Sequence, residues 1–160
     1  MADMLSLCAH LPEVALAPGE TLVREGERGD GLWVLVRGAL RVFKGGVPVN
    51  TVTHPGALIG EMSLLLDSAY GATVIASEPC VLRHAADGRA LLAGDPQIAR
   101  HVAVGLAERL NVVTSYLADL KHQYGHAPGM AMVSDVLDEL AQRHVPAARP
   151  GSRRDPEPDY

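Results

Sequence analysis

The chain has 160 residues, of which 48% are hydrophobic and only 4% aromatic, so Val, Leu, Ile and Ala must build the core of a domain of ordinary size. The formal net charge of −5 argues against nucleic acid as the main partner, because phosphate backbones attract clustered positive charge. Two cysteines exclude a disulfide scaffold, and no apolar run approaches the roughly 20 residues that span a bilayer. Met1 to Leu11 lack the basic start of a signal peptide, so we expect a soluble cytoplasmic protein.

Between Leu16 and Arg83, short runs rich in Val, Leu and Thr alternate with glycines. Such runs at regular spacing are typical of antiparallel strands joined by tight turns. We expect strands at Thr21–Val23, Leu32–Val36, Ala39–Phe43, Val47–Thr53, Ala72–Ala76 and Cys80–Leu82. Both faces of Leu32–Val36 are apolar, which predicts that this strand is covered on both sides.

The hydrophobic period changes after Asp95 and Pro96, a pair that favours the start of a helix. An apolar stripe at helical spacing then runs up to Gly125, through Ile98, Val102, Leu106, Leu110, Val113, Leu117, Leu120 and Tyr124. A helix over 96–124 would be about 40 Å long, more than a small β domain covers. We expect a homodimer through this helix, because an amphipathic face needs a partner. The alternative is that the following segment folds back on it.

The rest of the chain predicts a short helix and a tail. Val133, Val136, Leu137 and Leu140 recur at helical spacing, with Ser134 or Asp135 near the start. Residues 146–160 carry four prolines and little to bury, which is typical of a flexible tail. We therefore predict a domain over 1–124, a helical extension over 125–145 and a tail over 146–160.

Residues 55–74 hold a pattern that points to a binding site. Gly60 permits a tight turn at the end of a strand, Glu61–Leu65 can form one helical turn, and a strand from Ala72 returns across it. Backbone N–H groups at the start of such a helix are typical of an anion site.

This segment resembles the phosphate-binding cassette of cyclic nucleotide-binding domains, in which Gly-Glu and an apolar run precede an Arg-Ser/Thr-Ala group. Further matches lie at Pro18–Glu20, Arg24–Asp30, Val34–Gly38, Leu82–Asp87, Asp95–Pro96 and Leu106–Leu110, so the resemblance covers roughly residues 16–112. It implies a mainly β fold with α-helices, in which a jelly-roll-like β-barrel is followed by a long C-terminal helix and, in this chain, by the short second helix.

The resemblance implies cAMP or cGMP as the ligand, with no other cofactor. The implied ligand-binding residues are Ile59, Gly60, Glu61, Met62, Ser63, Tyr70, Gly71, Ala72 and Thr73. Glu61 stands where the family's Glu accepts a hydrogen bond from the ribose 2′-hydroxyl. Tyr70 replaces the Arg that pairs with the cyclic phosphate, and Gly71 replaces the Ser or Thr that touches phosphate or purine.

Loss of the Arg predicts nucleotide binding weaker by one to several powers of ten. Two compensations stay open. Arg24, Arg41 or Lys44 can reach the pocket from a neighbouring segment, or the pocket takes a ligand with less phosphate character, including the chain's own end at Asp159–Tyr160.

The resemblance implies a non-catalytic regulatory or sensory module. Ligand occupancy would shift the helix after Pro96, and a dimer partner or another, unidentified protein would read that shift. The alternative is a degenerate member that binds no nucleotide and acts as a dimerising interaction scaffold.

Three other functions are not expected. The chain after Tyr124 holds one predicted helix, whereas a helix-turn-helix reader of DNA needs two. No serine or cysteine lies in a nucleophile motif, so an enzyme is not expected. His122 and His126 have helical spacing, but Gly125 between them ends the helix, so no metal site is expected.

Overall fold

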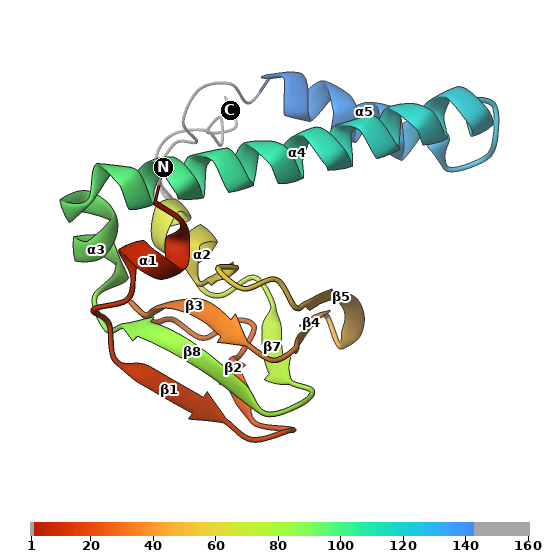
Figure 1. Cartoon of the computed structure of the whole chain (residues 1–160). Coiled ribbons are helices and arrows are strands. Elements are labelled where there is room, and N and C mark those ends of the chain that lie inside the picture. The colour runs from red at the N-terminus through yellow and green to blue at the C-terminus, as the bar shows by residue number, and fades with distance from the viewer. Residues whose placement is uncertain (1, 143–160) are drawn as a thin grey trace, which may run out of the picture. The chain divides into compact units, whose positions relative to one another are not determined.

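The computed structural model describes residues 2–142, which divide into one compact unit that ends at Val102 and a second that begins at Ala103. The first unit contains the strands (Figure 1). They are β1 Glu13–Leu16, β2 Thr21–Val23, β3 Leu32–Arg37, β4 Leu40–Lys44, β5 Val47–Val52, β6 Leu58–Ile59, β7 Thr73–Ala76 and β8 Cys80–Ala85. The helices are α1 Met4–Leu7, α2 Glu61–Leu66, α3 Gly88–Gly94, α4 Pro96–Tyr124 and α5 Met130–Gln142.

The strands form two four-stranded antiparallel sheets, with the orders β1-β8-β3-β6 and β2-β7-β4-β5. The mainly β fold is confirmed, but the expected barrel is corrected, because within residues 2–142 no strand ladder joins the two sheets. The physical reason lies at the edges. Each of the edge strands β2 and β6 has only three or two residues and pairs with one neighbour in its own sheet, β7 and β3 respectively.

One hydrophobic core fills the space between the sheets. It contains Leu35 of β3 and Leu82 of β8 from one sheet, and Leu40 of β4 and Val74 of β7 from the other. Strand β3 contributes to cores on both of its faces, since Val34 is fully buried against a second cluster. The prediction that this strand is covered on both sides is thereby confirmed.

Short helices lie beside β3 and β8 in the first unit (Figure 1). Met4 and Cys8, at α1, pack with Val34 and with Ile98 of the first turn of α4. Leu64 of α2 packs with Leu32 and Ala85, and the partly buried Leu91 and Leu92 of α3 border both clusters. The candidate segment is thus joined through α3 to the start of the long helix.

Helix α4 begins and ends where the sequence predicts. The Asp95 carboxylate caps it by accepting from the Gln97 and Ile98 N–H groups at 2.8 and 3.3 Å, and Tyr124 is its last residue. None of the helices in residues 2–142 is long and apolar enough to cross a membrane.

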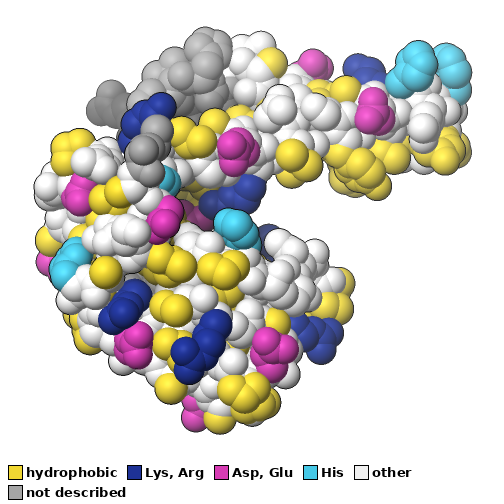
Figure 2. All heavy atoms as spheres, viewed as in Figure 1, with side chains coloured by type: hydrophobic (Ala, Val, Ile, Leu, Met, Phe, Trp, Pro, Cys, Tyr) yellow, Lys and Arg dark blue, Asp and Glu magenta, His cyan; other side chains and the backbone are white. Residues whose placement is uncertain are grey.

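The second unit begins inside α4, at Ala103. Helix α5 starts at Met130, earlier than Ser134, and the predicted tail over 146–160 lies outside the described residues. Apolar side chains are exposed along the part of α4 in this unit (Figure 2). They include Val104, Leu110, Val112, Val113, Tyr116 and Tyr124.

Candidate functional site

Gly60 shapes the start of the candidate site. Its φ of +99° lies in the left-handed region, and a Cβ at this position would sit 2.6 Å from the carbonyl oxygen of Gly31. Only glycine fits this approach without displacing backbone. The Gly60 carbonyl accepts from the Leu64 N–H at 3.3 Å and from Ser63 Oγ at 3.0 Å. These hydrogen bonds form the first turn of α2, where the sequence predicts a helical turn.

The two faces of α2 differ sharply in burial. Glu61 and Ser63 are only 3% and 6% exposed, and Ile59 just before them is 7% exposed. Met62 is 52% exposed, so it does not lie on the buried face with its neighbours. The predicted binding residues of this segment therefore separate into an inward set and one outward side chain.

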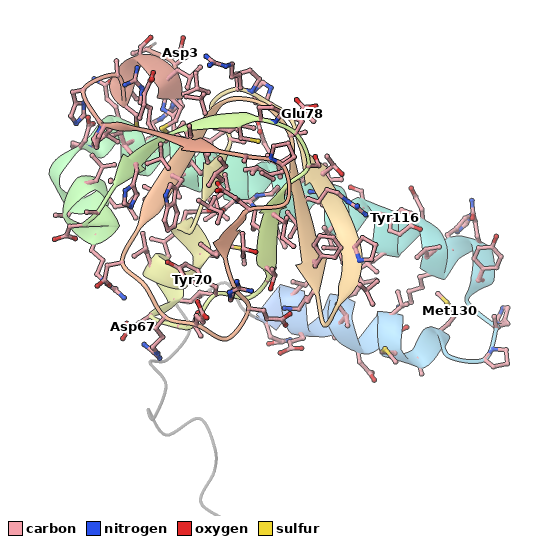
Figure 3. All side chains as sticks on the ribbon, turned by 90° about the horizontal axis from the view of Figure 1, so that it is seen from below. Asp3, Asp67, Tyr70, Glu78, Tyr116 and Met130 are labelled. Atoms are coloured by element: carbon pink, nitrogen blue, oxygen red, sulfur yellow. The ribbon has the colours of Figure 1, made fainter. Side chains whose placement is uncertain are left out.

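The end of α2 is held by a residue that the sequence interpretation did not single out. Arg89 of α3 donates from Nη1 to the Leu64 carbonyl at 3.0 Å and from Nη2 to Asp67 Oδ1 at 2.8 Å. Its Nε also lies 3.7 Å from Asp30 Oδ1. Asp67, which has a φ of +52°, precedes Tyr70 on the segment that follows α2 (Figure 3). No local motif marks Arg89, because its partners are distant in sequence.

Tyr70 is part of the core. It is 9% exposed and its ring centroid lies 6.4 Å from that of Trp33. Its backbone pairs with the loop before β3, since its N–H donates to the Glu27 carbonyl and its carbonyl accepts from the Gly26 N–H, both at 2.9 Å. A Cβ on Gly29 would overlap the Tyr70 hydroxyl, so glycine at 29 leaves room for the ring.

The pKa of the Tyr70 hydroxyl is shifted by burial and by two acidic side chains. Burial raises the pKa of Tyr70 above its ordinary value, and the negative charges of Asp30 and Glu27 raise this pKa further. The position that the family pattern gives to a cation therefore lies in a negative field, although its side chain here is neutral.

Lys44, at the end of β4, reaches the other end of the site. Its Nζ donates to the Gly71 carbonyl at 2.7 Å. The sequence offered two other cations besides Lys44. Arg24 forms an ion pair with Glu27 at 3.9 Å, and the Arg41 guanidinium lies 5.1 Å from the Phe43 ring centroid.

Thr73 completes the connection of this segment to the loop before β3. Its Oγ1 accepts from the Glu25 N–H at 2.9 Å. Glu25 also accepts through Oε2 from the Gly45 N–H at 2.8 Å. The half-buried Ala72 lies between Gly71 and Thr73 without a side chain that can hydrogen-bond.

The candidate segment carries a buried carboxylate at Glu61 and hydroxyls at Ser63, Tyr70 and Thr73. The exposed Lys44 ammonium contacts the same segment at the Gly71 carbonyl. Within the described part of the chain, no three His, Cys, Asp or Glu side chains cluster as metal ligands would. This donor and acceptor set suits an oxygen-rich organic ligand.

Comparison with known families and relatives gives consistent matches. The family model described as the cyclic nucleotide-binding domain matches residues 13–105, which include the whole candidate segment. A cAMP-dependent protein kinase regulatory subunit of Yarrowia lipolytica is 36% identical over 77 residues, 48% of this chain and 20% of the relative. The acetyltransferase Pat of Mycolicibacterium smegmatis is 32% identical over 78 residues, 47% of this chain and 23% of the relative. The chain thus matches about a fifth of the length of these relatives.

Solved structures show the same fold. The catabolite activator protein of Thermus thermophilus is 25% identical with a TM-score of 0.58, over 91% of this chain and 85% of that protein. A structure from work on a cyclic-GMP-dependent signalling pathway in bacterial phytopathogenesis is 26% identical with a TM-score of 0.59, over 69% of this chain and 94% of the other.

Proposed function

The chain belongs to the cyclic nucleotide-binding domain family, and on this premise we propose that it is a regulatory domain that senses a cyclic nucleotide at residues 59–73. The proposal includes no chemical step, because the family model that matches the chain describes a ligand-binding domain. cAMP and cGMP are the two ligands to test, since the kinase subunit of Yarrowia lipolytica is named for cAMP and the phytopathogenesis pathway for cyclic GMP.

One observation supports this proposal above the others, namely the retained frame of the cassette. Gly60 keeps a φ of +99°, Glu61 and Ser63 face inward, and the segment from Tyr70 to Thr73 is hydrogen-bonded to the loop before β3. This backbone geometry and the inward acid are what the family pattern of Gly-Glu and an apolar run requires, so the segment keeps the arrangement that would hold a ligand.

The affinity should be low. Tyr70 offers at most a neutral hydroxyl where the family pattern has a guanidinium, and a charge-assisted bond to phosphate is worth about 1.5–3 kcal/mol. Its loss corresponds to about one to two powers of ten in Kd. We therefore expect a dissociation constant about one to two powers of ten higher than that of a domain with Arg at this position.

The signal would leave through the helices of the first unit. Leu64 of α2 packs in a cluster that Leu91 and Leu92 of α3 border, and the same two leucines border the cluster of Ile98 in α4. A ligand that favours one position of α2 would thereby favour one position of α3 and of the start of α4.

Thermal unfolding in the presence of cAMP, cGMP or linear 5′-AMP tests the proposal. A ligand at 100 times its Kd adds about 2.7 kcal/mol to the free energy of unfolding, which shifts Tm by several degrees. We expect a concentration-dependent rise with a cyclic nucleotide and a smaller one with 5′-AMP. Unchanged Tm values with all three at millimolar concentration would remove the sensing function.

The exposed apolar side chains of α4 support a second candidate, a dimerising scaffold that needs no ligand. Leu110 and Val113 are 51% and 50% exposed, and both lie on the predicted apolar stripe. Light scattering should then give twice the chain mass of 16.9 kDa. Val113→Glu should restore the single-chain mass, whereas Ser115→Glu, on another face of the helix, should not. A mass near 16.9 kDa for the wild type would remove this candidate.

A further inference from the structure

The ammonium of Lys44 lies beside a position that the family uses for ligand contact. It donates to the Gly71 carbonyl at 2.7 Å, and it is 3.8 Å from the place where a Cβ on Gly71 would be. Gly71 stands where the family pattern has a Ser or Thr. The cation therefore occupies the immediate surroundings of a side chain that this sequence lacks.

A network that does not involve the ammonium holds Lys44 in this place. Lys44 ends β4, and the next residue, Gly45, donates its N–H to Glu25 Oε2 at 2.8 Å. The Glu25 N–H donates in turn to Thr73 Oγ1 at 2.9 Å. The tip of the β4–β5 hairpin is thus fixed to the last residue of the candidate site, and Lys44 with it.

The ammonium can serve a ligand without leaving Gly71. A lysine ammonium has three N–H donors, and the Gly71 carbonyl takes one of them. The side chain is exposed, so a molecule in the site can approach it from solvent. Arg28 and Arg89, two further cations near this segment, donate to the carbonyl and the carboxylate of Asp67 at 3.4 and 2.8 Å.

We propose that Lys44 is the cation of this ligand site and donates a charge-assisted hydrogen bond to an oxygen of the bound nucleotide. This inference rests on the proposed function, which it deepens by naming a ligand contact outside the segment 59–73. Two oxygens have the required chemistry, a cyclic phosphate oxygen and the carbonyl oxygen of a guanine base. The first is present in both cAMP and cGMP, the second only in cGMP.

Calorimetric titration of the full chain with cAMP and with cGMP tests the inference. The variants are Lys44→Gln, Lys44→Arg and, as a matched control, Arg41→Gln, which removes the same charge from the same strand. We expect Lys44→Gln to weaken binding about 10- to 100-fold, the equivalent of one charge-assisted bond, while Arg41→Gln stays within about twofold of the wild type. Lys44→Arg should retain most of the affinity.

The loss of affinity of Lys44→Gln for cAMP, compared with its loss for cGMP, identifies the nucleotide oxygen that Lys44 contacts. Equal weakening of cAMP and cGMP assigns the contact to the phosphate, and weakening of cGMP alone assigns it to the base. A second readout separates a ligand contact from a Lys44–Gly71 hydrogen bond that only stabilises the fold. The Kd of the wild type and of Arg41→Gln should rise with salt concentration more steeply than that of Lys44→Gln, because an ionic contact is screened.

Two negative results are distinguishable. If the wild type binds a cyclic nucleotide and Lys44→Gln binds it as well as Arg41→Gln does, the role of Lys44 is refuted while the sensing function stands. If the wild type binds neither nucleotide, the proposed function fails and the inference fails with it. Circular dichroism and Tm of each variant establish that an affinity change does not reflect unfolding.

Discussion

Replacing Tyr70 by Arg restores the residue type that the family pattern has at this position. The side chain at 70 is 9% exposed, and the carboxylates of Asp30 and Glu27 add to burial in raising the tyrosine pKa. A negative potential that disfavours tyrosinate favours a guanidinium. We therefore expect Tyr70→Arg to bind cAMP more tightly than the wild type does.

The size of both effects follows from the surroundings of Tyr70. One new charge-assisted bond to the phosphate is worth about 1.5–3 kcal/mol, or about 10- to 150-fold in Kd. The free energy of unfolding falls, because the ring leaves a core cluster that includes Val74 and loses its contact with Trp33. We expect a loss of about 2–4 kcal/mol, since the cost of removing a buried ring is partly offset by the two carboxylates.

Isothermal titration of Tyr70→Arg with cAMP measures the gain, and urea unfolding measures the loss. Tyr116→Arg is the matched control, because Tyr116 is 63% exposed on α4 (Figure 3) and the substitution adds the same charge. It should change neither quantity by more than about 0.5 kcal/mol. A folded Tyr70→Arg whose Kd for cAMP stays within twofold of the wild type would contradict the placement of the phosphate beside residue 70.

Three further predictions concern stability and titration. Gly60→Ala should lower the free energy of unfolding in urea by at least about 3 kcal/mol, and Gly26→Ala by about 1–2 kcal/mol. Both glycines have positive φ, but of the two only Gly60 faces a backbone oxygen, at 2.6 Å from a Cβ at that position. Equal losses for the two variants would refute the close approach. The Tyr70 pKa is raised above 10.0, so the folded chain keeps a proton that the unfolded chain loses, and stability should fall as pH rises above about 10. Tyr70→Phe should flatten that fall in denaturation measured at several pH values. Cys8 and Cys80 are buried, and the pKa of Cys8 is raised mainly by burial and further by the negative charge of Asp95. Both thiols should therefore react with a disulfide reagent only after unfolding. A fast-reacting thiol in the native chain would contradict this.

The sequence determined the features that depend on neighbouring residues. Asp95 and Pro96 define the start of α4, because capping uses groups within one turn. Thr21–Val23 is strand β2 as predicted, and the helical turn after Gly60 is α2, one residue longer than expected. The cassette pattern also located the candidate segment, since its glycine, its acid and its apolar run are contiguous.

Tertiary structure decided what depends on residues far apart in the chain. The division into two sheets rather than a barrel follows from pairings such as that of β1 with β8, which no local pattern encodes. The two-residue strand β6 exists only because β3 offers it a partner. Of the three cations that the sequence left open, packing brings Lys44 into contact with Gly71, a position 27 residues away. Side-chain reach is set by how distant segments are brought together, so residue identity alone could name the candidates for the cation but could not choose among them.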